Sequence, residues 1–203
     1  MTKWGFIGSF SPKLTRDEPA QLVPRKSAGV AVIFRSNKGE EEVLLIRRAE
    51  RKGDPWSGQV AFPGGMVSPT DRSFEETARR ETVEEVGIDL TPRAGVFLGY
   101  MRELKVRVRE VVVVPSVFRL DVAVAVILSN EVAAYEWVSL GKLASDEARS
   151  TYLLHRDGEA IAFPSFVHQG LVIWGLTERI LSAIIRNRKD AGNDGVLGDV
   201  ERY

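Results

Sequence analysis

The sequence predicts an α/β fold, an α/β/α sandwich in which a mixed β-sheet lies between helices. A wholly apolar run at residues 29–34 predicts a strand in the middle of that sheet. An acidic segment between Ser73 and Gly87 predicts a helix, and apolar residues at helical spacing over 173–188 predict another. Because predicted strands precede and follow the acidic helix, the sheet and the helices are expected to form layers.

Length and composition describe one ordinary globular domain of 203 residues. Lysine plus arginine and aspartate plus glutamate are equal at 28 each, so no overall basic charge indicates nucleic acid or a membrane as a partner. The chain has no cysteine, which excludes disulfides, thiolate catalysis and cysteine-bound zinc. No apolar run approaches the length of a bilayer span and no signal-peptide core follows Met1, so a cytoplasmic location is expected.

Three parts are expected along the chain: an N-terminal arm at 1–26, the main domain at 27–188 and a polar tail at 189–203. The arm carries apolar side chains between small residues, so it must pack on something. We expect it to cross its own domain. A partner subunit is the alternative host, and the protein would then be a homodimer.

The first predicted strands form a hairpin. Residues 37–39, Asn-Lys-Gly, predict a turn between strand 29–34 and a second strand at 43–46. A loop rich in turn-forming residues, 53–58, follows. The next apolar run, 60–63, predicts a strand that ends at a pair of glycines.

That glycine pair, Gly64 and Gly65, has a backbone that tolerates close approach by a ligand. The acidic helix follows after a polar loop. Ser73 and Glu76 have the S-x-x-E spacing of a capping box, which predicts the start of the helix. Gly87 is the expected residue at its end.

The second half of the chain predicts further strands at 95–101 and 111–120. Pro115 interrupts the latter and suggests a sheet edge or a bulge. The apolar stretch 122–128 is expected to continue the sheet. A mixed segment then leads into a short helical turn at 140–143.

A hairpin and a helix complete the domain. Asp157-Gly158 predicts a two-residue turn between strands at 151–155 and 160–163. The helix expected from Ile173 to about 188 has an apolar stripe of Ile173, Leu176, Ile180, Leu181 and Ile184.

The acidic helix carries the chemistry. At about 100° per residue, Glu81, Glu84 and Glu85 fall within an arc of roughly 100° on one side. Three close carboxylates repel one another unless a positive group lies between them, and Mg²⁺ prefers oxygen ligands and keeps waters for phosphate substrates. The alternative is a solvated face of i,i+4 ion pairs, in which Arg80 bonds Glu76 or Glu84.

The string GQVAFPGGMVSPTDRSFEETARRETVEEVGI, residues 58–88, resembles the signature of the Nudix hydrolases, G-x5-E-x7-R-E-U-x-E-E-x-G-U with U aliphatic. The resemblance implies a Nudix-type sandwich and metal-dependent hydrolysis of a diphosphate linkage. Two features depart from the signature. Asp71 stands for its first glutamate, with one extra residue before Arg80, and Thr82 stands where an aliphatic residue is usual.

The resemblance also implies roles. Arg80 orients the carboxylates, and the general base is a glutamate of the motif, such as Glu84, or Glu131 from the second half. The ligands of Mg²⁺ or Mn²⁺ are expected to be Gly65, through a backbone carbonyl, with Glu81, Glu84 and Glu85.

Three stretches resemble the additional signatures of coenzyme A pyrophosphatases within this group: LLIRRA at 44–49, GQVAFPGG at 58–65 and IWGLTERIL at 173–181. They imply a small-molecule nucleotide substrate, coenzyme A or a derivative. Ile46 replaces a threonine of the signature, and the segment 53–57 makes the spacing one residue longer. The residues expected to bind the substrate are Arg48, Arg51, Phe62 and Gly64.

Two alternatives use the same motif. One is a pyrophosphatase of ADP-ribose or another nucleotide sugar, whose diphosphate is the same target. The other is a Nudix-fold module that senses a nucleotide without cleaving it, against which the complete set of acids argues.

Overall fold

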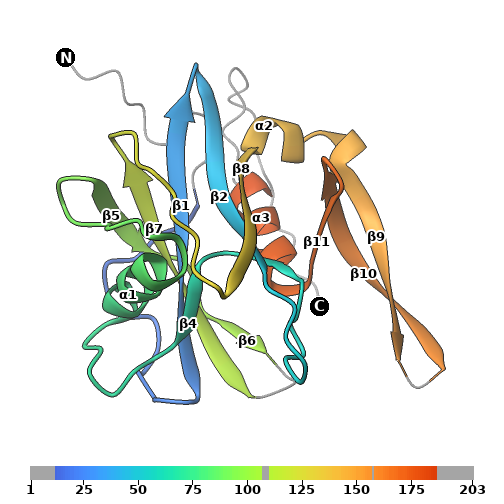
Figure 1. Ribbon diagram of the computed structural model, residues 1–203, viewed down its shortest axis with the longest axis horizontal. Coiled ribbons are helices and arrows are strands. Elements are labelled where there is room, and N and C mark those ends of the chain that lie inside the picture. The colour runs from blue at the N-terminus through green and yellow to red at the C-terminus, as the bar shows by residue number, and fades with distance from the viewer. Residues whose placement is uncertain (1–11, 107–109, 157, 187–203) are drawn as a thin grey trace, which may run out of the picture.

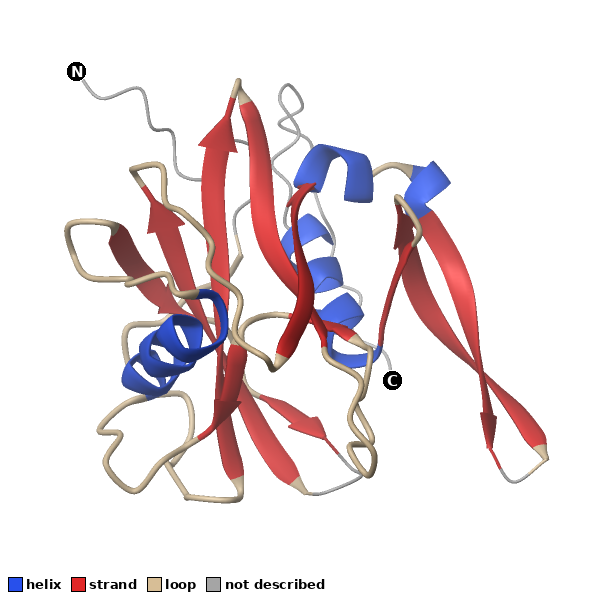
Figure 2. Cartoon of the chain, viewed as in Figure 1, coloured by secondary structure: helices blue, strands red, loops and turns tan. Residues whose placement is uncertain are grey.

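The chain forms a large mixed β-sheet with a helix on each face and a smaller three-stranded sheet beside it (Figures 1 and 2). The computed structural model describes residues 12–106, 110–156 and 158–186. The strands of the large sheet are β1 (Ser27–Asn37), β2 (Glu40–Arg48), β3 (Val60–Ala61), β4 (Gly64–Met66), β5 (Gly95–Tyr100), β6 (Leu104–Val106), β7 (Val111–Leu120) and β8 (Val132–Ser139). Those of the small sheet are β9 (Arg149–Arg156), β10 (Glu159–His168) and β11 (Leu171–Trp174). The helices are α1 (Phe74–Val86), α2 (Leu140–Leu143), the 3₁₀ turn η1 (Asp146–Ala148) and α3 (Gly175–Arg186).

Strand β1 lies at the centre of the large sheet. It pairs with β2 and β4 in antiparallel orientation and with β7 in parallel orientation. Alternate residues of β1 face opposite sides, so Val32 and Phe34 join a core that includes α3. Ala31 and Ile33 join a separate core that includes α1. The predicted α/β/α sandwich is confirmed, and Figure 1 shows α1 and α3 on opposite faces of the sheet.

The hairpin β1–β2 follows the prediction, with Lys38 and Gly39 in the left-handed conformation that such a tight turn requires. The expectation that the next strand ends at the glycine pair is wrong. Gly64 and Gly65 lie inside β4, where Gly65 is the partner of Gly29 in β1. The glycines therefore belong to the sheet and are held by its ladder.

Helix α1 begins and ends where predicted. The Ser73 hydroxyl accepts the Glu76 N–H at 3.0 Å, and Gly87 ends the helix with φ 68°. The reciprocal half of the capping box is absent, because the Glu76 carboxylate accepts the N–H of Arg72 at 2.7 Å. Glu76 also pairs with the Arg72 guanidinium, so it is not the ion-pair partner of Arg80.

The stretch 122–128 does not continue the sheet, contrary to expectation. It runs past the C-terminal end of α1, where the Ile127 N–H donates to the Val86 carbonyl at 2.9 Å and the Ser129 N–H to the Glu85 carbonyl at 3.0 Å. The last carbonyls of a helix have no partner within the helix, and this segment supplies two of the missing donors.

Pro115 does not mark a sheet edge, because β7 lies between β1 and β5. The residues of β7 before Pro115 pair with β6 and those after it pair with β5. The proline therefore falls between two antiparallel partners, where its missing N–H costs little. The bulge lies in the facing strand β5, between Phe97 and Gly99.

The predicted hairpin becomes β9–β10, which extends away from the body of the molecule (Figure 1). Helix α3 begins at Gly175 rather than at Ile173, because Ile173 and Trp174 pair with β10 as part of β11. Its buried stripe includes Ile180, Leu181 and Ile184, as predicted. In the described ranges no helix is long and apolar enough to cross a bilayer.

The described part of the N-terminal arm, residues 12–26, crosses its own domain. Thr15 and Tyr100 exchange backbone hydrogen bonds of 2.9 and 2.8 Å, and Arg16 donates to the Phe97 carbonyl at 3.1 Å. The Tyr100 hydroxyl also donates to Glu18. The apolar residues of the arm, 4–10, and the tail, 189–203, lie outside the described residues, and the boundaries of the three parts stay a prediction.

Candidate functional site

The glycine pair in β4 fits against β1 and α1 only because it lacks side chains. A Cβ on Gly64 would lie 2.5 Å from the Gly29 carbonyl oxygen and 2.6 Å from the Val30 Cα. A Cβ on Gly65 would lie 2.4 Å from the carboxyl carbon of Glu81. The backbone of Gly65 is therefore the surface against which the Glu81 carboxylate rests.

Glu85 reaches the same pair of glycines from the next turn of α1. Its carboxylate accepts the Gly64 N–H at 2.9 Å, and the residue is only 3% exposed. Burial raises the pKa of Glu85 to about 7, although the Gly64 hydrogen bond opposes the shift. Burial also raises the pKa of Glu81, against the opposing Arg80 guanidinium. Two desolvated carboxyl groups thus meet at one short stretch of backbone.

Glu84 lies differently. Its side chain is 56% exposed, and its carboxylate accepts a hydrogen bond from Arg80 at 3.2 Å. The three acids share one side of α1, as predicted, but the structure brings only Glu81 and Glu85 to the glycines. Within the described part of the chain, no three His, Cys, Asp or Glu side chains are gathered as a complete metal site.

Arg80 connects the acids. Its guanidinium bonds the Glu81 carboxylate at 2.7 Å, the Glu84 carboxylate at 3.2 Å and the Met66 carbonyl at 3.1 Å. On its other side it makes a two-point contact with Asp71, at 3.1 and 3.0 Å. Such a planar, forked arrangement is one that arginine alone among the cationic side chains can make.

Asp71 is the residue whose role the sequence left open. Its side chain is 5% exposed and also accepts the Ser68 N–H at 2.8 Å and the Thr77 hydroxyl at 2.9 Å. Burial alone would raise its pKa, but the hydrogen bonds from Arg80, Ser68 and Thr77 outweigh burial and lower it. The one-residue insertion before Arg80 therefore does not separate the two side chains.

The predicted phosphate-binding arginines have carboxylate partners. Arg48, at the end of β2, bonds Asp54 at 2.8 Å and lies 4.0 Å from Glu85. Arg51 bonds Glu131 at 3.2 Å. Glu131 directly precedes β8 and lies close enough to Glu85 that its charge contributes to the raised pKa there.

Phe62 is a correction to the set of substrate-binding residues. Its ring is 4% exposed and lies in the core that includes α3. It lies between β3 and β4 and offers almost no surface to a ligand. Gly64, by contrast, donates its N–H into the site, as described above.

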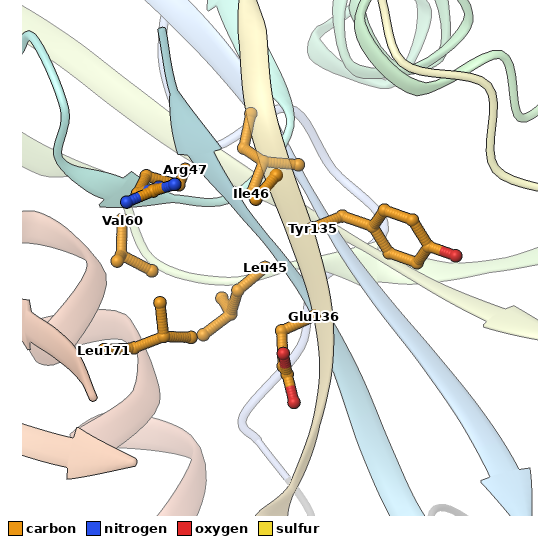
Figure 3. A pocket seen from close by; sticks show the side chains of 8 residues that line it. Leu45, Ile46, Arg47, Val60, Tyr135, Glu136 and Leu171 are labelled. Carbon is orange, nitrogen blue, oxygen red and sulfur yellow. The ribbon is translucent and has the colours of Figure 1, made fainter. Parts of the chain in front are cut away.

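A small pocket of about 40 Å³ lies elsewhere, between β2, β3, β8 and β11. Figure 3 shows Leu45, Val60 and Leu171 facing one another there, whereas Tyr135 points away. Neither Glu85 nor any of the three acids that Arg80 contacts lines this pocket, so it is separate from the candidate site.

The donor set at the glycines fits a hard divalent cation. Glu81 and Glu85 supply carboxylate oxygens, and both lie against the glycine backbone. Burial raises the pKa of both groups, so a nearby cation would stabilise their charged forms. Glu84 is exposed, and among the described residues its one side-chain partner is Arg80, so its carboxylate would have to turn toward the glycines to bind the same cation.

Comparison with known proteins gives a match between residues 24–156 and the NUDIX domain model. The human mitochondrial coenzyme A diphosphatase NUDT8 is 31% identical over 154 residues, which cover 74% of this chain and 64% of that protein. The peroxisomal coenzyme A diphosphatase ndx-8 of Caenorhabditis elegans is 30% identical over 140 residues, 68% of this chain and 59% of that protein.

Other relatives are matched over a smaller share of their length. An uncharacterized protein of Schizosaccharomyces pombe, C14C4.10c, is 35% identical over 117 residues, 51% of this chain and 35% of that protein. Thus the chain spans from about a third to three fifths of S. pombe C14C4.10c and C. elegans ndx-8. Among solved structures, a MutT/nudix family protein from Enterococcus faecalis aligns with TM-score 0.50 and 23% identity, over 84% of this chain and 64% of that one. This likeness concerns the fold alone.

Proposed function

The chain belongs to the NUDIX family, and on this basis we propose that it hydrolyses the diphosphate linkage of a nucleoside diphosphate derivative with Mg²⁺ or Mn²⁺. One observation carries the proposal: the buried Glu85 and the Glu81 carboxylate converge on the backbone of Gly64 and Gly65. A sensor that only binds a nucleotide has no need of two desolvated acids held in this way.

In this proposal Glu81, Glu84 and Glu85 hold the cation together with a backbone carbonyl of the glycine pair. When bound there, the cation neutralises phosphate charge and lowers the pKa of an attacking water. Arg80, fixed by Asp71, keeps the Glu81 and Glu84 carboxylates in place. Arg48 offers its positive charge beside the acids, where a phosphate oxygen of the substrate would bind.

The proton of the attacking water needs an acceptor. Glu84 and Glu131 are the two candidates, because both carboxylates are largely exposed and accessible to water while an arginine holds each of them. Glu131 pairs with Arg51 at 3.2 Å, which fixes its position at the start of β8.

Coenzyme A, or a close derivative, is the substrate we propose. The support is the identity of about 30% to relatives named as coenzyme A diphosphatases, together with the stretches at 44–49, 58–65 and 173–181 that resemble their signatures. The test is mass spectrometry of coenzyme A incubated with the purified chain and Mg²⁺ or Mn²⁺. We expect 3′,5′-ADP and 4′-phosphopantetheine; intact coenzyme A beside cleaved ADP-ribose would contradict this substrate and leave the diphosphatase chemistry.

Arg80→Lys is expected to weaken cation affinity and slow turnover, by about tenfold each, because one ammonium group cannot hold Asp71 and two glutamates at once. A titration with Mn²⁺ checks the affinity. Arg79→Lys is the matched control, because Arg79 pairs with Glu75 on the same helix. Wild-type affinity in Arg80→Lys would reduce Arg80 to a surface ion pair.

Arg51→Ala is expected to raise the KM for coenzyme A about tenfold and to change the KM for dephospho-coenzyme A much less, because a charge-assisted bond to the 3′-phosphate is lost. Arg51 is partly exposed beside Glu131, where such a phosphate could reach it. Arg47→Ala serves as the control, since Arg47 lines the separate pocket of Figure 3. An equal change for both substrates would mean that Arg51 does not contact this phosphate.

A further inference from the structure

Arg48 lies between the carboxylates of Asp54 and Glu85, and its distances to the two differ. One of its terminal nitrogens bonds Asp54 at 2.8 Å, and the other lies 4.0 Å from the Glu85 carboxylate. Its Nε is buried and has no hydrogen-bond partner among the described residues. The position of the guanidinium is therefore set by its terminal nitrogens, of which the one on Asp54 makes the short contact.

The loop that carries Asp54 holds this carboxylate in one place. The second Asp54 oxygen accepts the Trp56 N–H at 3.0 Å, and the Ser57 N–H donates to the Asp54 carbonyl at 3.1 Å. The Ser57 hydroxyl in turn accepts the Arg51 N–H at 2.8 Å, which closes the loop onto the end of β2. Gly53 and Gly58 supply the left-handed conformations at the two ends, with φ 87° and 70°.

Without the bond to Asp54, the Arg48 guanidinium would form an ion pair with the Glu85 carboxylate. A shift of about 1 Å would turn the 4.0 Å separation into a direct ion pair. The Gly64 N–H, Glu81 and Glu131 also act on Glu85, and among the described residues Arg48 is the cationic side chain that lies within 4.0 Å of its carboxylate. A direct pair would neutralise the charge on Glu85 and would occupy the terminal nitrogen of Arg48 that does not bond Asp54.

We propose that Asp54 is a positioning residue that holds Arg48 away from Glu85, which keeps Glu85 available to a divalent cation and Arg48 to a phosphate. The inference rests on the proposed function, in which Glu85 is a cation ligand. It also gives a role to the loop 53–57, whose extra residue departs from the signature of the related pyrophosphatases. Asp54 acts through Arg48 and touches neither the cation nor the substrate.

The test is the affinity of the full chain for Mn²⁺, measured by calorimetry without substrate. Asp54→Asn keeps an acceptor for the Trp56 N–H but removes the charge that holds Arg48, and it should weaken Mn²⁺ binding about tenfold. Asp54→Ser, which can still cap the loop but cannot reach Arg48, should have the same effect. Glu50→Gln, which removes a charge from the same segment, should leave the affinity within about twofold of wild type.

A double-mutant cycle shows whether Asp54 acts through Arg48. In an Arg48→Ala background, Asp54→Asn should leave Mn²⁺ affinity unchanged within about twofold, because no guanidinium remains to move onto Glu85. An equal loss of affinity in both backgrounds would mean that the charge of Asp54 acts directly, and it would overturn the inference.

Glu85→Gln separates this inference from the proposed function. If Glu85→Gln binds Mn²⁺ as tightly as wild type, Glu85 is not a ligand and the proposed function itself fails. If Glu85→Gln binds weakly while Asp54→Asn and Asp54→Ser bind like wild type, only the role of Asp54 is overturned.

Discussion

Glu85→Gln is expected to lower turnover by on the order of a hundredfold to ten-thousandfold, since a metal ligand supports several kcal/mol of barrier reduction. Glutamine fills the same space and can still accept the Gly64 N–H, but it is a poor ligand for a divalent cation. The substitution also removes a buried negative charge beside Glu81. The melting temperature in metal-free buffer should therefore stay unchanged or rise.

Steady-state kinetics with saturating Mg²⁺ and a thermal melt in EDTA check the two parts of this result. Glu75→Gln is the matched control, because Glu75 lies on the same helix and pairs with Arg79 outside the site. Turnover near that of wild type would remove Glu85 from the active site. A large loss of stability together with the loss of turnover would make its role structural.

Gly65→Ala is expected to lower turnover by about a hundredfold, because a misplacement of about 1 Å in a catalytic group has that order of effect. The new Cβ would lie 2.4 Å from the Glu81 carboxyl carbon, so the carboxylate must leave the glycine backbone. The Glu81 carboxylate is the end of a flexible side chain, so it can move with little loss of folding free energy. The melting temperature should therefore change by only about 2 °C, which corresponds to a fraction of a kcal/mol.

The neighbouring glycine supplies the contrast. In Gly64→Ala the new Cβ would meet the backbone of Gly29 and Val30 at 2.5 and 2.6 Å, which cannot move without disturbing β1. This variant should lose about 1–3 kcal/mol of stability, in the range of overpacked cores. Gly141→Ala, whose Cβ would find no atom closer than 3.5 Å, is the neutral control. Normal turnover in Gly65→Ala would show that Glu81 need not rest on the glycine.

Local signals in the sequence predicted much of the fold. The cap at Ser73 and the end at Gly87 depend on neighbours within one turn, and both lie where the pattern places them. The apolar run in β1 reflects burial on both faces. The prediction that 122–128 continues the sheet was wrong. This stretch bonds the last carbonyls of α1, and such contacts between residues about 40 positions apart leave no local pattern in the sequence.

The sequence indicated which side chains of α1 share a side, but not how deeply each is buried. The spacing of Glu81, Glu84 and Glu85 places them on one side of α1, but spacing does not reveal that Glu84 stays exposed while Glu85 is buried. Burial depends on where β4 lies against the helix. The contact of Arg48 with Asp54 likewise depends on how a loop closes, which is a property of its turns rather than of a motif.

Hydrolysis of coenzyme A in water enriched in ¹⁸O, with and without divalent cation, tests the central claim most directly. The chain should cleave the diphosphate only with Mg²⁺ or Mn²⁺ and place one ¹⁸O in one of the two phosphate products, whereas Glu85→Gln should leave the substrate intact over the same time. Equal cleavage in EDTA, or equal cleavage by Glu85→Gln, would contradict the assignment of the acids beside Gly64 and Gly65 as a cation-dependent diphosphatase site.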